Sequence, residues 1–544
     1  MTEYAIALDI GTSGLRCQAI DMETKETVAT AITQRHPIPG MNVIDHVNFA
    51  MKSGEDVANG LIIKCVNQLF GKLGIDLAKV KRVAVCGNPF QLSLFQNIEI
   101  RDLAYAGKNM LRELGVVSPP RDGAILQAKD TGIKGMPNAQ VFIPPAVRHE
   151  IGADAMAMLM ITGVLDSKEP CIVADYGTNA EMALICGDGR IITGSAAAGP
   201  ALEGQEIERG MLAAPGAISD VNIQPEGWQC DVLNKAMIGV TSDTVDPTTG
   251  RVTKTAPGAI RALGITGTGV VATLYEGLKT KKVEPPKIIT PESKLCLQDG
   301  INITSHDVDE AGKAIGALRA GFLTLLHEAG MWTGDVDIAY MSGASGLYVD
   351  AKKAMGVGMV VPGVSRIVQF GNTSIEMARR IAMGEMDMDY LREFAKKLRA
   401  EHCMFATSET FKNIYSIEYS LWCGGMPMSE YNNMLDLYKM PPLTEPKHEL
   451  SVKRVSMTDL PDTDKCPVQI IESGTFLTGE LDGCIGCHKC MKECPERALE
   501  IVKQGDKMYA RCASDRCAGT ACRRCERICP KGVMHMDDLK VASE

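Results

Sequence analysis

The chain has 544 residues and a formal net charge of −10, with 45% hydrophobic and 23% charged residues. This length calls for several domains, and the composition is that of a soluble globular protein. The acidic balance argues against nucleic acid as a partner. No apolar run approaches the ~20 residues that span a bilayer, so we expect no membrane insertion. No signal peptide is visible, and we expect a cytoplasmic protein.

Predicted strands and helices alternate through the first 385 residues, which indicates α/β domains. The first series has expected strands at 3–10, 15–22, 24–32 and 80–88, and helices at 55–73 and 153–164. The second series has a strand–turn–strand at 171–186, a helix at 307–329, strands at 335–340 and 366–370, and a helix at 375–383. The series therefore predict two related lobes, at 1–168 and 169–385.

The remaining residues divide by composition. Residues 386–440 are predicted to be mainly helical. Residues 441–480 are rich in proline, charge and Ser/Thr, which is typical of a linker. We expect a small separate domain at 481–544.

Two similar turns lie about 165 residues apart, each at the end of a predicted strand. One reads Asp-Ile-Gly-Thr-Ser-Gly at 9–14, and the other reads Asp-Tyr-Gly-Thr-Asn at 175–179. Glycine lets the backbone approach a phosphate, and the following hydroxyl and N–H groups donate hydrogen bonds to it. An aspartate at a strand end can hold Mg²⁺ or orient a water molecule for phosphoryl transfer. The matched pair predicts a duplicated fold that closes on ATP from both sides, with Asp9 and Asp175 as catalytic candidates.

Nine of the 19 cysteines lie between residues 484 and 529. Four of them form Cys-x₂-Cys-x₂-Cys-x₃-Cys followed by proline, and four more end at a second Cys-Pro. Bacterial two-cluster ferredoxins hold two [4Fe–4S] cubes in this way, with the fourth cysteine of each run ligating the other cube. The sequence therefore predicts one cluster on Cys484, Cys487, Cys490 and Cys529, and a second on Cys494, Cys517, Cys522 and Cys525.

Other uses of these cysteines fit less well. Disulfides need an oxidising compartment. Zinc sites usually repeat Cys-x₂-Cys with longer gaps. The second set is irregular, because a regular pattern puts a cysteine where Gly519 stands, and Cys512 is an alternative to Cys517 as ligand.

The region from about Glu3 to Arg380 resembles the ATP-dependent reductive activators of corrinoid proteins, in the acetate and sugar kinase/Hsp70/actin superfamily. The motifs that carry the resemblance are DIGTSG at 9–14, CGN at 86–88, GAD at 152–154, ADYGTNAEMAL at 174–184, GSAAAGPALEG at 194–204, ERGMLAAPGAI at 208–218, LGITGTG at 263–269, SGASG at 342–346 and FGNTS at 370–374. Many members carry a [2Fe–2S] domain before this core, whereas this chain has a cysteine-rich domain after it.

The resemblance implies a duplicated actin/Hsp70/sugar-kinase-like ATPase core with a small C-terminal α+β two-[4Fe–4S] ferredoxin-like domain. The implied activity is ATP- and Mg²⁺-dependent reduction of Co(II) corrinoid to Co(I). The implied partners are corrinoid proteins of methylamine methyltransferase systems in methanogenesis, with a low-potential donor such as ferredoxin. The chain lacks Asp-x-His-x-x-Gly, a common cobalamin-binding signature, so we expect the corrinoid on the partner.

Two other functions stay open at this point. One is an ATP-driven electron donor that activates a radical dehydratase or aromatic reductase, and the other is an ATP-binding redox sensor. All three hypotheses use the same nucleotide site. Its expected binding residues are Gly11, Thr12, Ser13, Gly177, Thr178, Asn179, Gly343 and Gly371.

Overall fold

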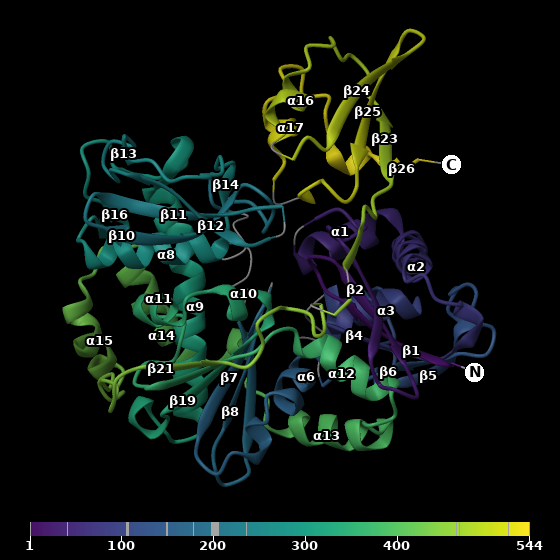
Figure 1. The fold of residues 1–544 in the computed structure, drawn as a ribbon, viewed down its shortest axis with the longest axis horizontal. Helices are drawn as coiled ribbons and strands as arrows, with labels where there is room; N and C mark the ends of the chain where they lie inside the picture. The colour runs from purple at the N-terminus through teal and green to yellow at the C-terminus, as the bar shows by residue number, and fades with distance from the viewer. Residues whose placement is uncertain are drawn as a thin grey trace. The chain divides into compact units, whose positions relative to one another are not determined.

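The computed structural model describes residues 2–40, 42–104, 108–147, 151–177, 179–196, 206–235, 237–463, 465–466, 468–494, 496–519 and 522–542. The chain forms two compact units (Figure 1). The first unit consists of Met1–Ala157, Ser374–Lys397 and Leu460–Glu544, and the second of Met158–Thr373 and Leu398–Asp459. The chain therefore leaves the first unit and returns to it twice.

A seven-stranded sheet forms the centre of the first unit. Its order is β22 (Val468–Ile471), β3 (Thr27–Thr33), β2 (Leu15–Asp21), β1 (Tyr4–Ile10), β4 (Val80–Gly87), β6 (Gln140–Ile143) and β5 (Ala124–Gln127). β1 is antiparallel to β2 and parallel to β4. Residues 5–10 of β1 are all buried, as expected of a central strand covered on both faces. Helices in or overlapping this unit are α1 (Val43–Ser53), α2 (Glu55–Lys72), α3 (Pro89–Gln96), α4 (Arg101–Ala104), α5 (Lys108–Glu113), α6 (Ala153–Ile161), α12 (Thr373–Ala382) and α13 (Met388–Ala400).

The second unit repeats this topology. Its six-stranded sheet has the order β21 (Ser451–Arg454), β20 (Arg366–Gln369), β19 (Ile338–Ser342), β7 (Cys171–Tyr176), β8 (Ala180–Ile185) and β9 (Ile191–Ala196). β7 is antiparallel to β8 and parallel to β19, as β1 is to β2 and β4. The two predicted lobes are thus built on the same strand order around β1 and β7, and each ends its central strand in an aspartate turn.

A further sheet and a helical layer complete the second unit. The sheet contains β13 (Val252–Lys254), β12 (Gly239–Val245), β11 (Gly227–Leu233), β10 (Ala217–Gln224) and β14 (Gly264–Ile265). The helices are α8 (Gly267–Lys279), α9 (Ser305–Glu328), α10 (Gly343–Tyr348), α11 (Ala351–Val357), α14 (Glu409–Trp422) and α15 (Tyr431–Leu437). There are also two small hairpins. One pairs β15 (Val283–Glu284) with β16 (Lys287–Ile288), and the other pairs β17 (Lys294–Cys296) with β18 (Asn302–Thr304). α9 packs closely on α14, because a Cβ on Gly312 would lie 2.6 Å from the Cβ of Trp422.

The C-terminal part of the first unit is a small α+β fold. Its sheet has the order β24 (Leu499–Gln504), β25 (Lys507–Ala513), β23 (Phe476–Glu480) and β26 (Lys540–Val541), with α16 (Lys489–Glu493) and α17 (Arg524–Arg527) beside it. The segment expected to be a linker, 441–480, holds β21, β22 and β23. β21 is exposed along its length, so it lacks the alternation of apolar residues that makes a strand recognisable in a sequence.

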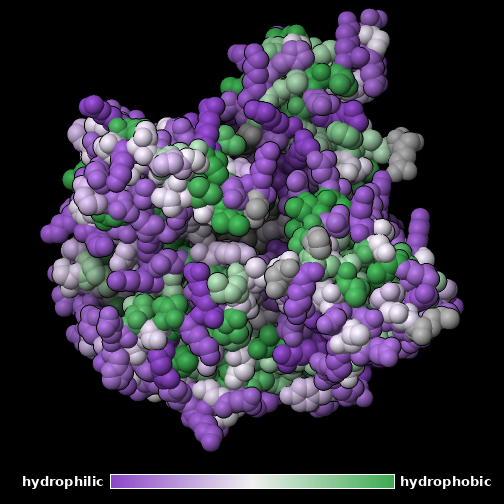
Figure 2. Space-filling model, in the orientation of Figure 1, coloured by the Kyte–Doolittle hydropathy of each residue, from purple (hydrophilic) through white to green (hydrophobic). Residues whose placement is uncertain are grey.

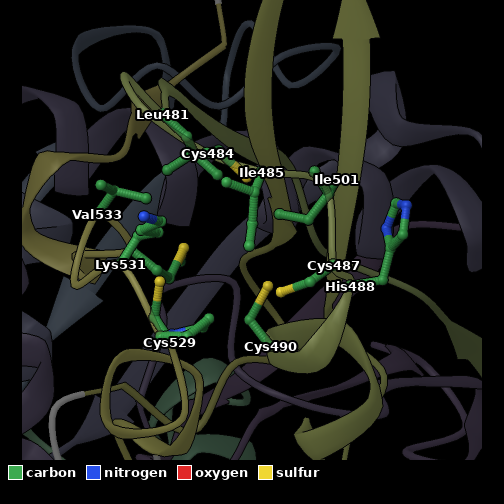
Figure 3. Close-up of a pocket in the computed structure, with 12 residues that line it drawn as sticks. Leu481, Cys484, Ile485, Cys487, His488, Cys490, Ile501, Cys529, Lys531 and Val533 are labelled. Carbon is green, nitrogen blue, oxygen red and sulfur yellow. The ribbon is translucent and has the colours of Figure 1, made fainter.

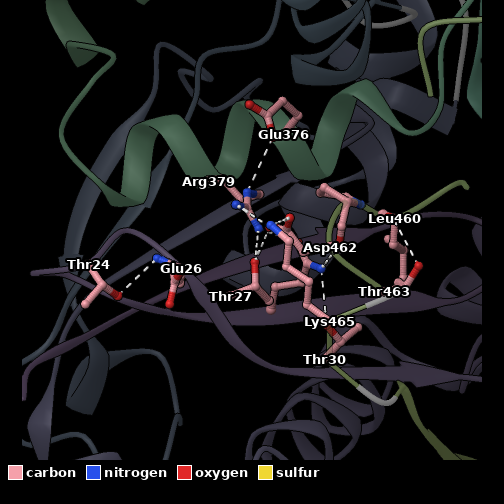
Figure 4. A network of polar contacts seen from close by, with 12 residues as sticks. Thr24, Glu26, Thr27, Thr30, Glu376, Arg379, Leu460, Asp462, Thr463 and Lys465 are labelled. Carbon is pink, nitrogen blue, oxygen red and sulfur yellow. Dashed lines mark hydrogen bonds and ion pairs between the residues drawn. The ribbon is translucent and has the colours of Figure 1, made fainter. Parts of the chain in front are cut away.

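A polar network joins the three segments of the first unit (Figure 4). Arg379 of α12 donates to the side chains of Gln18 on β2 and Thr27 on β3, and its Nη2 lies 3.1 Å from Asp462 Oδ2. Thr27 also donates to Asp462, at 2.8 Å. The network therefore fixes α12 and the segment after Leu460 to the sheet that begins the chain.

In the part of the chain that the structure describes, no helix combines the length and the apolar character that a membrane crossing needs. On the face seen in Figure 2, hydrophobic residues are dispersed among hydrophilic ones.

Candidate functional site

The first aspartate turn connects β1 and β2. The Gly11 N–H donates to the Gly14 carbonyl at 3.1 Å, which closes the turn. Asp9 lies opposite Arg16 in the β1–β2 register, and Arg16 Nη1 is 3.6 Å from Asp9 Oδ2. Asp9 and Thr12 are buried, and Ser13 is half-buried. The structure thus brings together the predicted Asp9, Gly11, Thr12 and Ser13, and adds Arg16, which was not among the predicted site residues.

Asn88, directly after β4, completes this turn. Its Nδ2 donates to Thr12 Oγ1 at 3.2 Å, and its Oδ1 accepts the Gln91 N–H at 2.9 Å, which caps α3. The preceding Gly87 has φ +155°, and a Cβ there would lie 2.6 Å from the Ile10 carbonyl oxygen. Glycine is therefore required for the end of β4 to approach the aspartate turn. The signal for Asn88 was its position after a strand that ends in glycine.

Asp154, at the start of α6, is a further residue of this site that the sequence did not indicate. Its Oδ1 accepts the Ala155 N–H at 2.9 Å. Loss of hydration, together with repulsion from Asp9, raises the pKa of Asp154 to about 6. A carboxyl group that titrates this close to neutral pH can exchange protons with a bound water molecule.

The second aspartate turn connects β7 and β8. Ser342, which ends the parallel strand β19, donates to Asp175 Oδ2 at 2.8 Å. Gly343 has φ +81°, and a Cβ there would lie 2.7 Å from Asp175 Oδ1. The Gly177 N–H donates to the Asn179 carbonyl at 3.2 Å. The remaining predicted residue of this turn, Thr178, lies outside the described residues.

The predicted Gly371 lies beside Gly343. The Gly343 N–H points at the Gly371 carbonyl at 3.4 Å, and a Cβ on Gly371 would lie 2.8 Å from the Thr458 carbonyl oxygen. In the β7–β8 register, Asp175 lies opposite Glu181, whereas its counterpart Asp9 lies opposite an arginine. The two turns therefore share a topology but differ in local charge.

Four of the predicted cluster ligands surround one pocket in the C-terminal fold. Its lining residues include Cys484, Cys487, Cys490 and Cys529. Figure 3 shows the sulfur atoms of Cys487, Cys490 and Cys529 pointing into this pocket, while His488 at its edge points away. The remainder of the lining is largely apolar, with Leu481, Ile485, Ile501, Val533 and Met534. Three cysteines close in sequence and one from the far end of the domain thus line the same pocket.

A second pocket gathers the other four predicted ligands. Its lining includes Cys494, Cys517, Cys522, Cys525 and Cys512. Backbone N–H groups point at two of the sulfurs. The Ala498 nitrogen lies 3.3 Å from the Cys494 sulfur, and the Gly519 nitrogen lies 3.4 Å from the Cys517 sulfur. Cys512 is buried on β25, and its thiol lies 3.9 Å from the Ala513 carbonyl.

The chemistry of both pockets fits iron–sulfur ligation. The Cys512 thiol and the Gly519 N–H donate toward the Cys517 sulfur and hold its pKa below the usual value. Burial alone would raise the pKa of Cys529, but the backbone N–H groups of residues 531–534 around its sulfur lower it. Burial raises the pKa of Cys490, Cys522 and Cys525, and iron would have to displace their protons. N–H groups directed at sulfur are a recurring feature around such clusters.

Two duplicated aspartate-turn sheets and a C-terminal pair of cysteine-lined pockets define an ATPase-type core joined to a ferredoxin-like domain. Family models match three parts of the chain. They are "RACo middle region" at residues 4–167, "C-terminal domain of RACo the ASKHA domain" at 169–432 and "4Fe-4S dicluster domain" at 483–533. ASKHA is the acetate and sugar kinase/Hsp70/actin fold.

The chain belongs to the family of RACo-type corrinoid activators and reductases. It is 49% identical to the "[Co(II) methylated amine-specific corrinoid protein] reductase" of Methanosarcina barkeri, over 95% of this chain and 96% of that protein. It is also 26% identical to the "Corrinoid activation enzyme RamQ" of Eubacterium limosum, over 66% of this chain and 60% of that protein.

A solved structure supports the fold. The "Reductive activator for corrinoid,iron-sulfur protein" matches with a TM-score of 0.60 and 22% identity, over 77% of this chain and 66% of that one. The expected actin/Hsp70/sugar-kinase-like core with a C-terminal ferredoxin domain is confirmed.

Proposed function

We propose that the protein is an ATP-dependent iron–sulfur oxidoreductase that reduces the Co(II) corrinoid of a partner protein to Co(I). The observation that carries this proposal is the 49% identity to a Co(II) corrinoid protein reductase, which reaches across both the core and the C-terminal domain. The partners are then corrinoid proteins of methylamine methyltransferase systems in methanogenesis. The thiol-rich pockets suit the reducing cytoplasm.

The overall reaction transfers one electron. A reduced low-potential donor, such as a ferredoxin, loses the electron, and Co(II) on the partner gains it to become Co(I). Co(I) corrinoid is a strong reductant, and each ~59 mV of uphill transfer costs a factor of ten in the equilibrium constant. Hydrolysis of ATP to ADP and phosphate supplies free energy that makes such a step favourable when it is coupled to a change in the partner's preferred state.

In the first unit, Asp9 and Asp154 would hold Mg²⁺ or position water, and Arg16 would neutralise charge beside Asp9. Gly11, Thr12 and Ser13 would bind phosphate, with Asn88 holding the Thr12 hydroxyl. In the second unit, Asp175 would act with Ser342. The other groups there, Gly177, Thr178, Asn179, Gly343 and Gly371, would bind the nucleotide. Magnesium-bound ATP supplies the phosphoryl group when it is present.

The eight predicted cysteines would hold two [4Fe–4S] clusters, which supply one-electron chemistry at low potential when bound. Cys484, Cys487, Cys490 and Cys529 form the first site. Cys494, Cys517, Cys522 and Cys525 form the second, with Cys517 favoured over Cys512 because a backbone N–H points at its sulfur.

The test is anaerobic. Reconstituted protein, a Co(II) corrinoid partner of a methylamine system and a low-potential reductant are mixed, and the Co(I) absorbance band is followed with and without Mg-ATP. We expect Co(I) to form only with ATP. Asp9→Asn and Asp175→Asn should each lower the rate at least about a hundredfold, the range for loss of a group that acts in the transition state.

The matched control is Asp188→Asn, an exposed carboxylate on the β8–β9 connection. It should leave the rate of Co(I) formation within about twofold, as expected for a surface substitution. ATP hydrolysis without Co(I), across several corrinoid partners and with intact clusters, would contradict the proposal. It would favour activation of a radical dehydratase or aromatic reductase instead.

A further inference from the structure

The predicted ligands in the two cysteine pockets differ in exposure. In the first pocket Cys487 is exposed, and the neighbouring Ile485 has 61% of its surface exposed. In the second pocket none of the predicted ligands, all of them described, is exposed. A redox partner can therefore reach Cys487 directly at the surface.

The loop that carries Cys517 is packed on the N-terminal part of the first unit. The Gly40 N–H donates to the Cys517 carbonyl at 2.9 Å, and Ser514 Oγ donates to the Pro37 carbonyl at 2.8 Å. Glu496, which lines the second pocket, pairs with Arg35 at 2.6 Å. These contacts hold one side of the second pocket against residues 35–40.

Two short helices connect the pockets. α16 places Cys490 in the first pocket, and Cys494 follows at its end in the second. α17 and the residues after it place Cys525 in the second and Cys529 in the first. Four helical residues span about 6 Å, so groups held in the two pockets are close neighbours.

Three exposed lysines lie on the segments that form the edge of the first pocket. Lys489 and Lys492 are exposed on α16, three residues apart and hence on one face of the helix. Lys531 is exposed in the lining itself. Among the described residues, none of these three ammonium groups forms an ion pair. The nearest carboxylate along the chain is Glu493 for Lys489 and Lys492, and Glu526 for Lys531.

We propose that this edge, defined by Ile485, Cys487, Lys489, Lys492 and Lys531, is the docking surface for an acidic electron-donor protein, and that electrons enter at the first site. An apolar centre with a charged rim is the usual anatomy of a transient protein interface. Opposite charges steer association, which speeds the encounter of two redox proteins. The inference rests on the proposed function, because it assumes that each of the two pockets holds a cluster.

The test measures donor binding first. The probe is an acidic two-[4Fe–4S] ferredoxin, titrated by calorimetry into the reconstituted protein at low ionic strength, without corrinoid or ATP. The test variant is Lys489→Gln/Lys492→Gln. The control is Lys503→Gln/Lys540→Gln, which makes the same change in net charge on β24 and β26 and touches neither pocket.

We expect the test variant to bind the ferredoxin at least about tenfold more weakly, and the control variant to stay within about twofold. Rising salt should weaken the binding of the unchanged protein more than that of the test variant. Stopped-flow reduction of the clusters by reduced ferredoxin should slow in parallel, while reduction by methyl viologen radical, a small cation, should not slow.

Two results would overturn the proposal. One is equal weakening in the test and control variants, which would mean that net charge alone matters. The other is unchanged ferredoxin binding in the test variant; a shifted midpoint potential with it would mean that the lysines tune the cluster. The ferredoxin-binding test contains no corrinoid, so its result can be interpreted even if the Co(I) assay fails.

Discussion

Arg319 and Glu418 form a buried ion pair between α9 and α14. Two parallel hydrogen bonds of 2.6 and 2.7 Å join the guanidinium to the carboxylate, and the Tyr431 hydroxyl also donates to Glu418. The Tyr431 ring lies 5.1 Å from the guanidinium carbon. A buried charge pair that is fully hydrogen-bonded contributes little net stability, but a charge left alone in the interior is costly.

Glu418→Ala should therefore lower the free energy of unfolding by about 3–5 kcal/mol, because Arg319 keeps its charge without a partner. Chemical unfolding of the second-unit helices, followed by circular dichroism, measures the change. Glu409→Ala on the same helix is the control. Its exposed pair with Lys412 is worth below about 1 kcal/mol. Similar losses of unfolding free energy in both variants would show that water reaches the Arg319–Glu418 pair.

His36 and His46 form a second buried group, stacked with ring centroids 4.2 Å apart. Burial lowers the pKa of His46 to about 4, and burial with repulsion from His46 lowers that of His36. Between pH 6.5 and 4 the folded protein thus binds fewer protons than the unfolded chain. The contribution of the two buried histidines to stability is present above pH 6.5 and is lost as the pH falls toward 4.

Because of His46 alone, the free energy of unfolding should fall by about 1.4 kcal/mol when the pH is lowered from about 7.5 to about 5.5. His46→Phe keeps a stacked ring but cannot take up a proton, so its pH dependence should be smaller by roughly that amount. Denaturant titrations at the two pH values test this. The exposed His448→Phe is the control. An unchanged pH dependence in His46→Phe would contradict the assignment.

Among the elements, the 514–519 loop depends on a glycine for its position. Gly519 has φ +64°, and a Cβ there would lie 2.9 Å from the Gly40 Cα. Gly505, in the β24–β25 turn, has φ +61°, but a Cβ there would meet no heavy atom within 4 Å. Both glycines therefore have a left-handed backbone, but only Gly519 lies against another segment of the chain.

Both substitutions by alanine should cost about 1 kcal/mol for the left-handed backbone. Gly519→Ala should cost a further 1–3 kcal/mol, about the range for overpacking, and should loosen the loop from Gly40. Amide hydrogen exchange of residues 37–40 and 514–519 is the measurement. We expect faster exchange in Gly519→Ala only. Equal exchange in the two variants would mean that the contact with Gly40 is weak.

At the scale of the whole molecule, the C-terminal fold has a much smaller core than the other parts. Its buried set includes Leu477, Leu499, Ile501 and Ala510, together with cysteines that line the two pockets. Folds of this size commonly need a metal or disulfides for stability. The large sheets around β1 and β7 have extensive cores of their own.

Removing iron with a chelator under reducing conditions should therefore unfold the C-terminal part selectively. We expect amide exchange in β23 and β25 to rise at least about tenfold, while exchange in β1 and β7 stays unchanged. Hydrogen exchange with mass spectrometry compares the two forms. Retained protection in β25 after iron removal would show that the apolar core is sufficient.

Much of the candidate site was predictable because its residues are consecutive. Gly11, Thr12 and Ser13 follow Asp9 in one turn, and local spacing identifies such a set without a fold. Asp154 and Asn88 were not predictable in the same way. A lone aspartate at a helix start and an asparagine after a strand are common, and only the parallel pairing of β4 with β1 brings Asn88 to Thr12.

The aspartate turns, the order of strands and helices along most of the core, and the crossed cysteine spacing were all readable from the amino-acid sequence. These features are encoded by short-range patterns, in which backbone conformation and ligand spacing depend on neighbouring residues. The folded chain was needed to show that β21 and β22 extend the two sheets, that Arg379 joins three distant segments, and that Cys487 is exposed while the other predicted ligands are not. Such contacts join residues far apart in the chain, and their energy depends on burial and geometry that local patterns do not contain.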